Sequence, residues 1–141
     1  MIRKVNYFCL LITILLLLFV SCRENIITPD NFASNINEPI LISEPNSYTF
    51  FINAENITID VINNALFSST MSRITISIVN YSSGSVNVRV IDPQSISRFN
   101  YFGSNDESLF TESLNGYIPQ AVGIKTFNFS GKLKVQLTKT F

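Results

Sequence analysis

The sequence predicts an all-β domain, built as an antiparallel β-sandwich of about seven to nine short strands. Apolar residues alternate with polar ones along several stretches, which places the apolar set on one face of an extended strand. Turn-forming residues separate these stretches, and no stretch after the first 22 residues keeps a helical apolar period over three turns. The pattern covers about 100 residues, enough for one domain and too few for two. A small β-barrel is the alternative architecture.

The alternation gives the expected strands in order along the chain. They lie at residues 40–42, 48–53, 57–62, 73–80, 86–91, 97–102, 108–113, 124–129 and 133–141. Isoleucine or valine occupies every second position of 73–80 and 86–91, so we expect a hairpin across a turn at 81–85. Residues 92–95 should turn the chain, because proline cannot continue a central strand. A second hairpin is expected around the Ser130-Gly131 turn.

This spacing of strands and turns resembles the immunoglobulin and fibronectin type III class of β-sandwich. The Cys-Trp-Cys core pattern of immunoglobulin domains is absent, because the chain has no tryptophan. The resemblance concerns architecture alone and implies no function.

The first 22 residues have the pattern of an export signal. Arg3 and Lys4 come before an apolar run that starts at Phe8 and ends at Val20. This run is too short for a comfortable bilayer crossing, which takes about 20 residues, but it suits the core of a signal peptide. An uncleaved anchor helix and an ordinary secretory signal with an incidental cysteine are the alternatives.

The run ends in Phe19-Val20-Ser21-Cys22, which resembles the lipobox of bacterial lipoproteins. In that family a small residue, here Ser21, lets the signal peptidase cut before the cysteine, here Cys22, whose thiol takes a diacylglyceryl group. The family most often has an aliphatic residue where this chain has Phe19. The resemblance implies that Cys22 carries several fatty chains, and stable attachment to a bilayer needs more than one.

The resemblance divides the chain into three parts. Residues 1–21 are the lipoprotein signal peptide, 22–39 a flexible tether and 40–141 the β-sandwich domain. The apolar residues of the tether, Phe32 among them, leave open a second interpretation, in which the tether packs on the domain. We expect a lipid anchor in a bacterial cell envelope, with the domain facing the periplasm or the exterior. Arg23 in place of aspartate favours the outer membrane over the inner one.

The composition argues against several classes of function. No histidine is present, which removes the usual general base and the commonest metal ligand, so we expect no catalytic triad, metal or cofactor. Cys9 lies in the signal and Cys22 would be acylated, so the domain would have no disulfide. Removing Arg3 and Lys4 leaves eight basic residues against ten acidic ones, which gives no reason to expect a nucleic acid partner.

Aromatic residues between positions 99 and 117 could form a shallow binding platform. The candidates are Phe99, Tyr101, Phe102 and Tyr117, with Phe110 nearby. Their rings could stack on the apolar faces of a sugar or peptide. The interpretation that we favour is that they fill the core of a protein without tryptophan.

Three acidic residues are the other candidates for chemistry. Paired carboxylates could hydrolyse a glycoside or bind calcium, and Asp106, Glu107 and Glu112 are the available acids. Adjacent residues of a strand point apart, and the alternating ligands of an EF-hand are missing. A solvated loop is therefore the favoured interpretation.

The carboxyl end of the chain is basic. Its lysines are Lys125, Lys132, Lys134 and Lys139. A solvated outer face or an edge strand guarded by lysines is favoured, and a docking patch for anionic lipid or polysaccharide is the alternative.

Three hypotheses about function follow. The preferred one is a non-enzymatic, membrane-anchored envelope lipoprotein that binds a partner or supports an assembly. Its partners would be membrane lipid, through acylated Cys22, and an envelope protein or polysaccharide. The second hypothesis is a carbohydrate-binding or adhesive module that uses the aromatics of residues 99–117. The third is an acid-based hydrolase that uses Asp106, Glu107 or Glu112.

Overall fold

The computed structural model describes residues 35–140, and all regular structure in this range is β-strand. The strands are β1 (Ile40–Glu44), β2 (Ser47–Ile57), β3 (Asp60–Asn64), β4 (Met71–Ile91), β5 (Ser97–Gly103), β6 (Glu107–Asn115) and β7 (Ala121–Lys139). Across this described range, no helix is long and apolar enough to span a membrane. The all-β prediction is confirmed. The signal peptide at 1–21, Cys22 and most of the tether lie outside the described residues.

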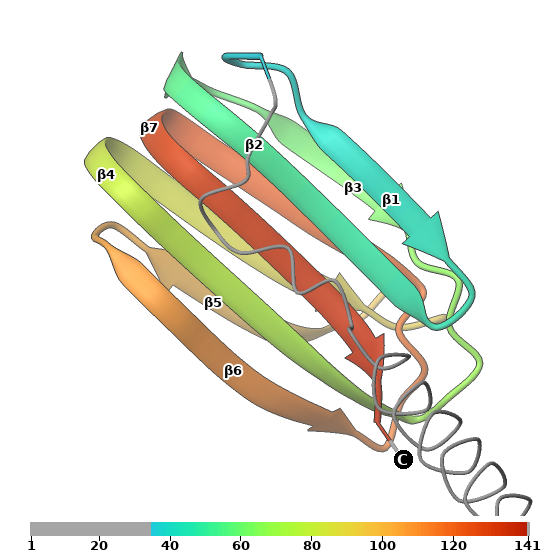
Figure 1. Cartoon of the computed structure of the whole chain (residues 1–141). Coiled ribbons are helices and arrows are strands. Elements are labelled where there is room, and N and C mark those ends of the chain that lie inside the picture. The colour runs from blue at the N-terminus through green and yellow to red at the C-terminus, as the bar shows by residue number, and fades with distance from the viewer. Residues whose placement is uncertain (1–34, 141) are drawn as a thin grey trace, which may run out of the picture. The chain divides into compact units, whose positions relative to one another are not determined.

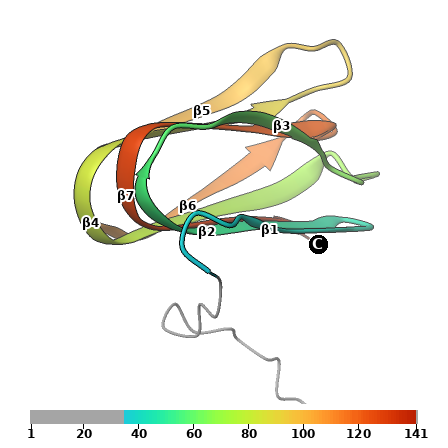
Figure 2. The same ribbon diagram turned by 90° about the horizontal axis from the view of Figure 1, so that it is seen from above.

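The strands form one antiparallel sheet that folds over into two layers (Figures 1 and 2). The first layer contains β1, β2, the second half of β7, the first half of β4, and β6. The second layer contains β3, the first half of β7, the second half of β4, and β5. Among the described strands, β1 does not pair with β3 and β5 does not pair with β6, so the sheet stays open. The β-sandwich is therefore the better description, and the small β-barrel is wrong.

The two predicted hairpins are wrong, because each corresponds to one continuous strand. β4 has 21 residues and β7 has 19, and both curve from one layer into the other (Figure 2). The predicted turn residues lie at the bends: Gly84 has a φ of 85° and Gly131 a φ of 149°. Pairing between β4 and β7 shifts register on both sides of Ser83. A left-handed residue inside a strand makes a bulge, which bends the strand without reversing it.

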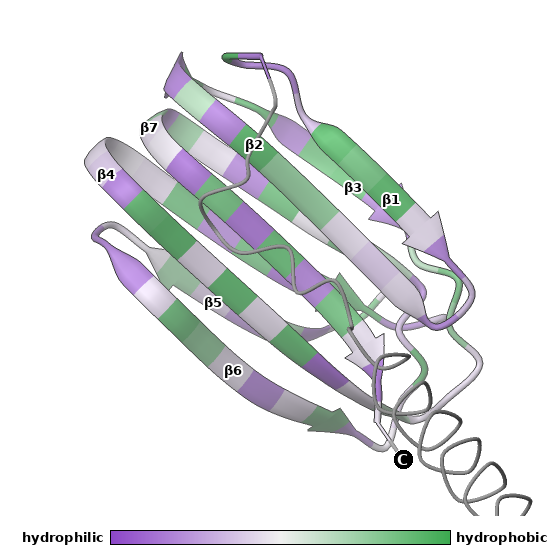
Figure 3. Ribbon diagram, viewed as in Figure 1, coloured by the Kyte–Doolittle hydropathy of each residue, from purple (hydrophilic) through white to green (hydrophobic). Residues whose placement is uncertain are grey.

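The core lies between the two layers and follows the predicted alternation. Both halves of β4 direct every second side chain inward, and hydropathy alternates along the strands in Figure 3. The fully buried apolar residues of β4 are Ile74, Ile76, Ile78, Val86, Val88 and Val90. Each such side chain contributes roughly 1.5–3 kcal/mol by leaving water. Within this part of the chain, burial of these apolar side chains therefore makes the main favourable contribution to the free energy of folding.

Two asparagines change which residues of a strand face the core. Ile124 and Thr126 are buried before Asn128 in β7, and Phe129 is buried after it, so the inward set passes from even to odd positions. Asn128 has a φ of 45°, and Asn56 of β2 has a φ of 50°. Asparagine tolerates this left-handed region better than most residues. The consequence in β7 is that Phe127 points outward.

The described chain enters the domain along β2. Ile36 forms a parallel bridge with Asn53, and the Asn37 backbone N–H donates to the Asn53 carbonyl oxygen at 2.7 Å. The Asn37 side chain also accepts from the Glu55 N–H at 2.8 Å and donates to the Glu55 carbonyl oxygen at 3.0 Å. Contacts with the domain therefore begin before residue 40.

Candidate functional site

The outer surface of the second layer combines exposed rings with amides and charges. We call it the second-layer face; it consists of Asp60, Ile62, Asn87, Arg89, Asn100, Phe102, Gly123, Lys125 and Phe127. Paired residues of antiparallel strands point to the same side, so Phe102, Asn87, Lys125 and Asp60 form one row across the layer. The next row joins Asn100, Arg89, Gly123 and Ile62 in the same way.

Two phenylalanines of this face stand in water. Phe102, on the edge strand β5, is 65% exposed, and Phe127, on the central strand β7, is 62% exposed. Phe127 follows Lys125 by two positions, so it lies on the same face as the row that contains Phe102. Burying one phenylalanine contributes roughly 1.5–3 kcal/mol. The two exposed rings could therefore contribute a substantial free energy of binding if a partner covered them.

Polar groups beside the rings are held in place. The Asn87 side-chain amide donates to Asn100 Oδ1 at 2.8 Å and to the Tyr101 carbonyl oxygen at 3.2 Å. Lys125 Nζ lies 3.0 Å from the Asp60 carboxylate. These bonds fix the amides, and they leave the exposed rings accessible on each side.

Arg89 lies across the backbone of Gly123. A Cβ placed on Gly123 would come within 3.3 Å of Arg89 Nε, so the missing side chain makes room for the guanidinium. Over residues 35–140, Arg89 has neither an ion pair nor a side-chain hydrogen bond. The face therefore carries one positive charge without a carboxylate beside it.

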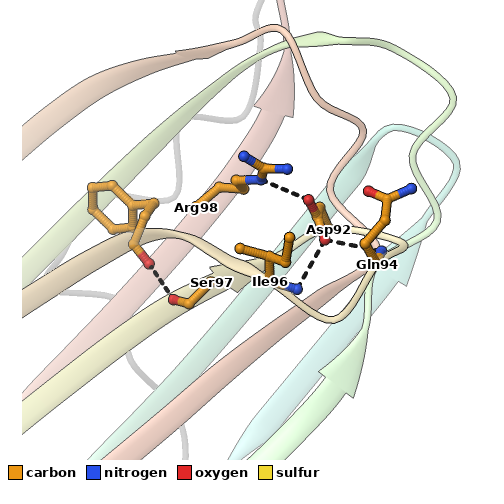
Figure 4. A network of polar contacts seen from close by, with 6 residues as sticks. Asp92, Gln94, Ile96, Ser97 and Arg98 are labelled. Atoms are coloured by element: carbon orange, nitrogen blue, oxygen red, sulfur yellow. Dashed lines mark hydrogen bonds and ion pairs between the residues drawn. The ribbon is translucent and has the colours of Figure 1, made fainter.

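The turn between β4 and β5 positions the edge of this face (Figure 4). Asp92 is fully buried and accepts three bonds: from the Gln94 and Ile96 N–H groups at 2.9 Å and from Arg98 Nε at 2.6 Å. Burial acts to raise the pKa of Asp92, but the bonds from Ile96, Arg98 and Gln94 outweigh it and hold this pKa below its usual value. The predicted turn at 92–95 is present, and an ionised Asp92 holds it.

The predicted aromatic residues do not share one surface. Phe99 is buried, and Phe110 lies between two of them: its ring centroid is 6.1 Å from that of Phe99 and 4.9 Å from that of Tyr101. Burial raises the pKa of Tyr101, and it raises the pKa of Tyr117 to about 12. Of the four candidates, Phe102 alone is mostly exposed, on the opposite face of β5 from Tyr101.

The three candidate acids are not assembled into a pair. Asp106 accepts a hydrogen bond from the Tyr81 N–H at 2.9 Å, which gives it a structural role. Glu107 and Glu112 are five positions apart on β6, so they are separated by about 17 Å along the strand. Glycosidases hold their two carboxyl groups within about 5–10 Å. Within the described residues, no group of three acids or cysteines could hold a metal ion.

The basic carboxyl end is divided between the two layers. Lys125 belongs to the second-layer face, whereas Lys132 and Lys134 project together from the outer surface of the first layer. Burial lowers the pKa of Lys134. The lysines therefore do not form one continuous docking patch.

A polar hollow lies at the bends. Its volume is about 380 Å³, and its lining includes Asn53, Asn80, Ser82, Ser130 and Lys132. No aromatic side chain lines it. No sequence pattern predicted this hollow, because it forms where two strands that we expected to be hairpins bend instead.

Sequence reasoning missed Asn87, Arg89 and Phe127. Asn87 and Arg89 occupy alternate positions between the buried valines of β4, and that alternation was the available signal for an outward position. Phe127 and Phe129 are two positions apart, so a regular strand would place both rings on one face. The left-handed Asn128 between them instead leaves Phe127 outward and Phe129 inward.

Comparisons with known proteins add little to this geometry. No protein-family model matches the chain, and no curated protein matches its sequence. A structure of the disulfide-linked pili that form Bacillus endospore appendages has a TM-score of 0.42 at 9% identity, covering 77% of this chain and 95% of that chain. A family 29 carbohydrate-binding module complexed with cellulohexaose has a TM-score of 0.39 at 11% identity, covering 72% and 75%. At such low TM-scores and identities, these likenesses carry no argument about function.

Proposed function

We propose that the chain is a non-enzymatic, lipid-anchored module of a bacterial cell envelope that binds its partner through the second-layer face. The motif Phe19-Val20-Ser21-Cys22, after a basic start and a short apolar run, supports the anchor at Cys22. The observation that carries the binding role is the pair of exposed rings, Phe102 and Phe127, on one face, with the amide of Asn87 between them held by Asn100. An exposed apolar group rimmed by polar residues is typical of an interaction surface.

Metabolic labelling with radioactive palmitate tests the anchor. Label should enter the wild-type chain and the Cys9→Ser variant, and it should be lost in Cys22→Ala. Label that persists in Cys22→Ala, or that never enters the wild type, removes the lipoprotein assignment. Cys9→Ser is the matched control, because it removes the other cysteine of the chain.

A polysaccharide is the ligand class that the second-layer face fits best. Aromatic rings can stack on the apolar faces of sugar rings, and the amides of Asn87 and Asn100 can exchange hydrogen bonds with sugar hydroxyls. Arg89 adds a cation without a carboxylate partner, which favours an acidic sugar. An envelope protein that covers the same rings is the second possibility.

A glycan array probed with the detergent-solubilised full chain tests this ligand class. We expect binding to at least one acidic glycan, with a loss of about ten-fold or more for Phe102→Ala or Phe127→Ala, since burying one phenylalanine contributes roughly 1.5–3 kcal/mol and about 1.4 kcal/mol is ten-fold in affinity. Leu109→Ala is the matched control, because Leu109 is also exposed but lies in β6 of the first layer. Binding that survives both phenylalanine variants, or that falls equally in the control, rules out this face.

A further inference from the structure

Gly123 is a glycine in the interior of a central strand. It pairs with Ile62 of β3 on one side of β7 and with Arg89 of β4 on the other. Because Val122 and Ile124 on either side face the core, a side chain at position 123 would point outward, yet this glycine is buried. Glycine weakens a strand interior and often marks a place where another group approaches closely. The reason for this glycine therefore lies in what covers it.

The Arg89 side chain covers Gly123. A Cβ on Gly123 would lie 3.3 Å from Arg89 Nε, 3.4 Å from Nη2 and 3.7 Å from Cζ. Because these three distances are nearly equal, the guanidinium lies flat over this position, with one of its faces against the backbone of β7. Its N–H groups then point along the second-layer face, where a bound ligand would lie. The glycine therefore leaves the space that the guanidinium occupies.

The surroundings of the guanidinium favour an anion. Lys125, the other cation of this face, is paired with Asp60 at 3.0 Å, whereas Arg89 has no ion pair within residues 35–140. Ile62, beside Gly123 on β3, is 60% exposed. A ligand that covers Ile62 together with the guanidinium would exclude water from the new ion pair, and an ion pair is stronger where less water surrounds it. The face therefore has one committed cation and one available cation.

We infer that Gly123 is a specificity-determining position, which lays the Arg89 guanidinium flat so that its N–H groups bind the carboxylate of an acidic sugar. A guanidinium holds a planar carboxylate through two parallel hydrogen bonds, so the pair depends on the placement of both groups. Phe127 follows Gly123 by four positions on the same face, about 14 Å along β7. The ring and the guanidinium therefore contact different sugars of one chain, and the ligand is an oligosaccharide rather than a single sugar.

This inference rests on the proposed function, because it concerns the same face, and paired glycans separate the two. The array carries oligogalacturonate, oligomannuronate and oligoglucuronate, each beside the same chain with its carboxyl groups reduced to alcohols. The detergent-solubilised full chain should bind at least one uronate about ten-fold more tightly than its reduced form, as expected for a charge-assisted pair. Arg89→Gln should abolish this preference and leave the affinity for the reduced form unchanged.

Gly123→Ala tests the positioning role, because it displaces the guanidinium without removing it. The preference for the uronate should fall about three-fold, since bidentate bonds depend on geometry. The urea midpoint should stay unchanged or rise, because alanine loses less conformational freedom in a strand than glycine does. Arg89→Lys keeps the charge without the planar fork and should also lose preference. Arg73→Gln is the matched control, because Arg73 lies in the half of β4 that belongs to the first layer.

Each other outcome overturns the inference. Equal binding of uronate and reduced chains, with both still weakened by Phe102→Ala, refutes carboxylate recognition and leaves the proposed function standing. Binding to none of the chains removes the polysaccharide ligand as well. A loss in Arg73→Gln as large as in Arg89→Gln assigns the preference to overall charge. A full preference in Gly123→Ala, or a lowered urea midpoint, shows that the glycine serves the fold alone.

Discussion

The outer faces of the two layers are built from the same long strands and differ in what they do with phenylalanine. The first layer buries Phe51 to 6% exposure, whereas the second leaves Phe102 at 65% and Phe127 at 62%. β4 and β7 contribute to both faces, so strand type does not explain the difference. The comparison teaches that one face belongs to the fold and the other remains available to a partner.

The largest expected effect comes from the bend that supports both faces. Gly84→Ala should lower the free energy of unfolding by about 4 kcal/mol, because the residue has a φ of 85° and a Cβ would collide with the Asn128 and Phe127 carbonyl oxygens. Gly116→Ala is the matched control, with the same φ and open space around it. In this control, backbone strain alone should lower the free energy of unfolding by only about 1–2 kcal/mol. Urea unfolding measures both, and equal losses would contradict the collision.

The direct test of the comparison is a pair of identical substitutions. Phe51→Ala should lower the free energy of unfolding by about 3 kcal/mol, as expected for a buried ring. Phe127→Ala should change it by less than about 0.5 kcal/mol, as expected for a surface position. Equal effects in urea unfolding would mean that the two faces do not differ in the way described.

A smaller, pH-dependent effect is expected at the turn that holds β5. The folded state lowers the pKa of Asp92 below the ordinary value of 3.8, so its contribution to stability is complete above that value and is lost as the pH falls through the folded pKa. Asp92→Asn should therefore lower the urea midpoint at pH 7, and the difference from wild type should shrink below pH 3.8. Asp60→Asn, which breaks only an exposed pair with Lys125, is the control and should have little effect at either pH. A difference at Asp92 that does not change with pH would contradict this assignment.

The smallest effect on stability is expected at the two exposed rings of the second-layer face, where we expect the largest effect on binding. The double variant Phe102→Ala, Phe127→Ala should unfold within about 1 kcal/mol of wild type, since both rings are exposed. Thermal unfolding measures this. A marked loss of stability would show that the second-layer face is also part of the fold.

The sequence predicted where the strands lie but not how they connect. Alternation located Ile74, Ile76 and Ile78 in the core, because a two-residue period fixes which side chains share a face. Glycine, serine and asparagine stand both in tight turns and in bulges, so residues 81–85 carried no signal that separates a hairpin from a bend. For that reason the sequence did not predict that the second half of each long strand continues in the same strand instead of reversing.

The candidate site was predicted only in part, for a related reason. Phe102 was named, but its role depends on which face of β5 it occupies, and the sequence placed it beside rings that are buried. Phe127 could not be chosen over Phe129, because the left-handed conformation of Asn128 decides between them. Pairing across the layer, which brings Asn87 between the two rings, depends on contacts far apart in the sequence.

The central position of β7 has a consequence for the order of folding. It is the last described strand along the chain, and it pairs with β2, β3 and β4. Ser47 at the start of β2 pairs with Thr138 near the end of β7, so β2 cannot form this pair until β7 has been synthesised. Neither layer can be completed during synthesis until nearly all of these residues have left the ribosome, and long-range pairing of this kind is slow. A nascent chain of this design therefore keeps both layers open until β7 has emerged.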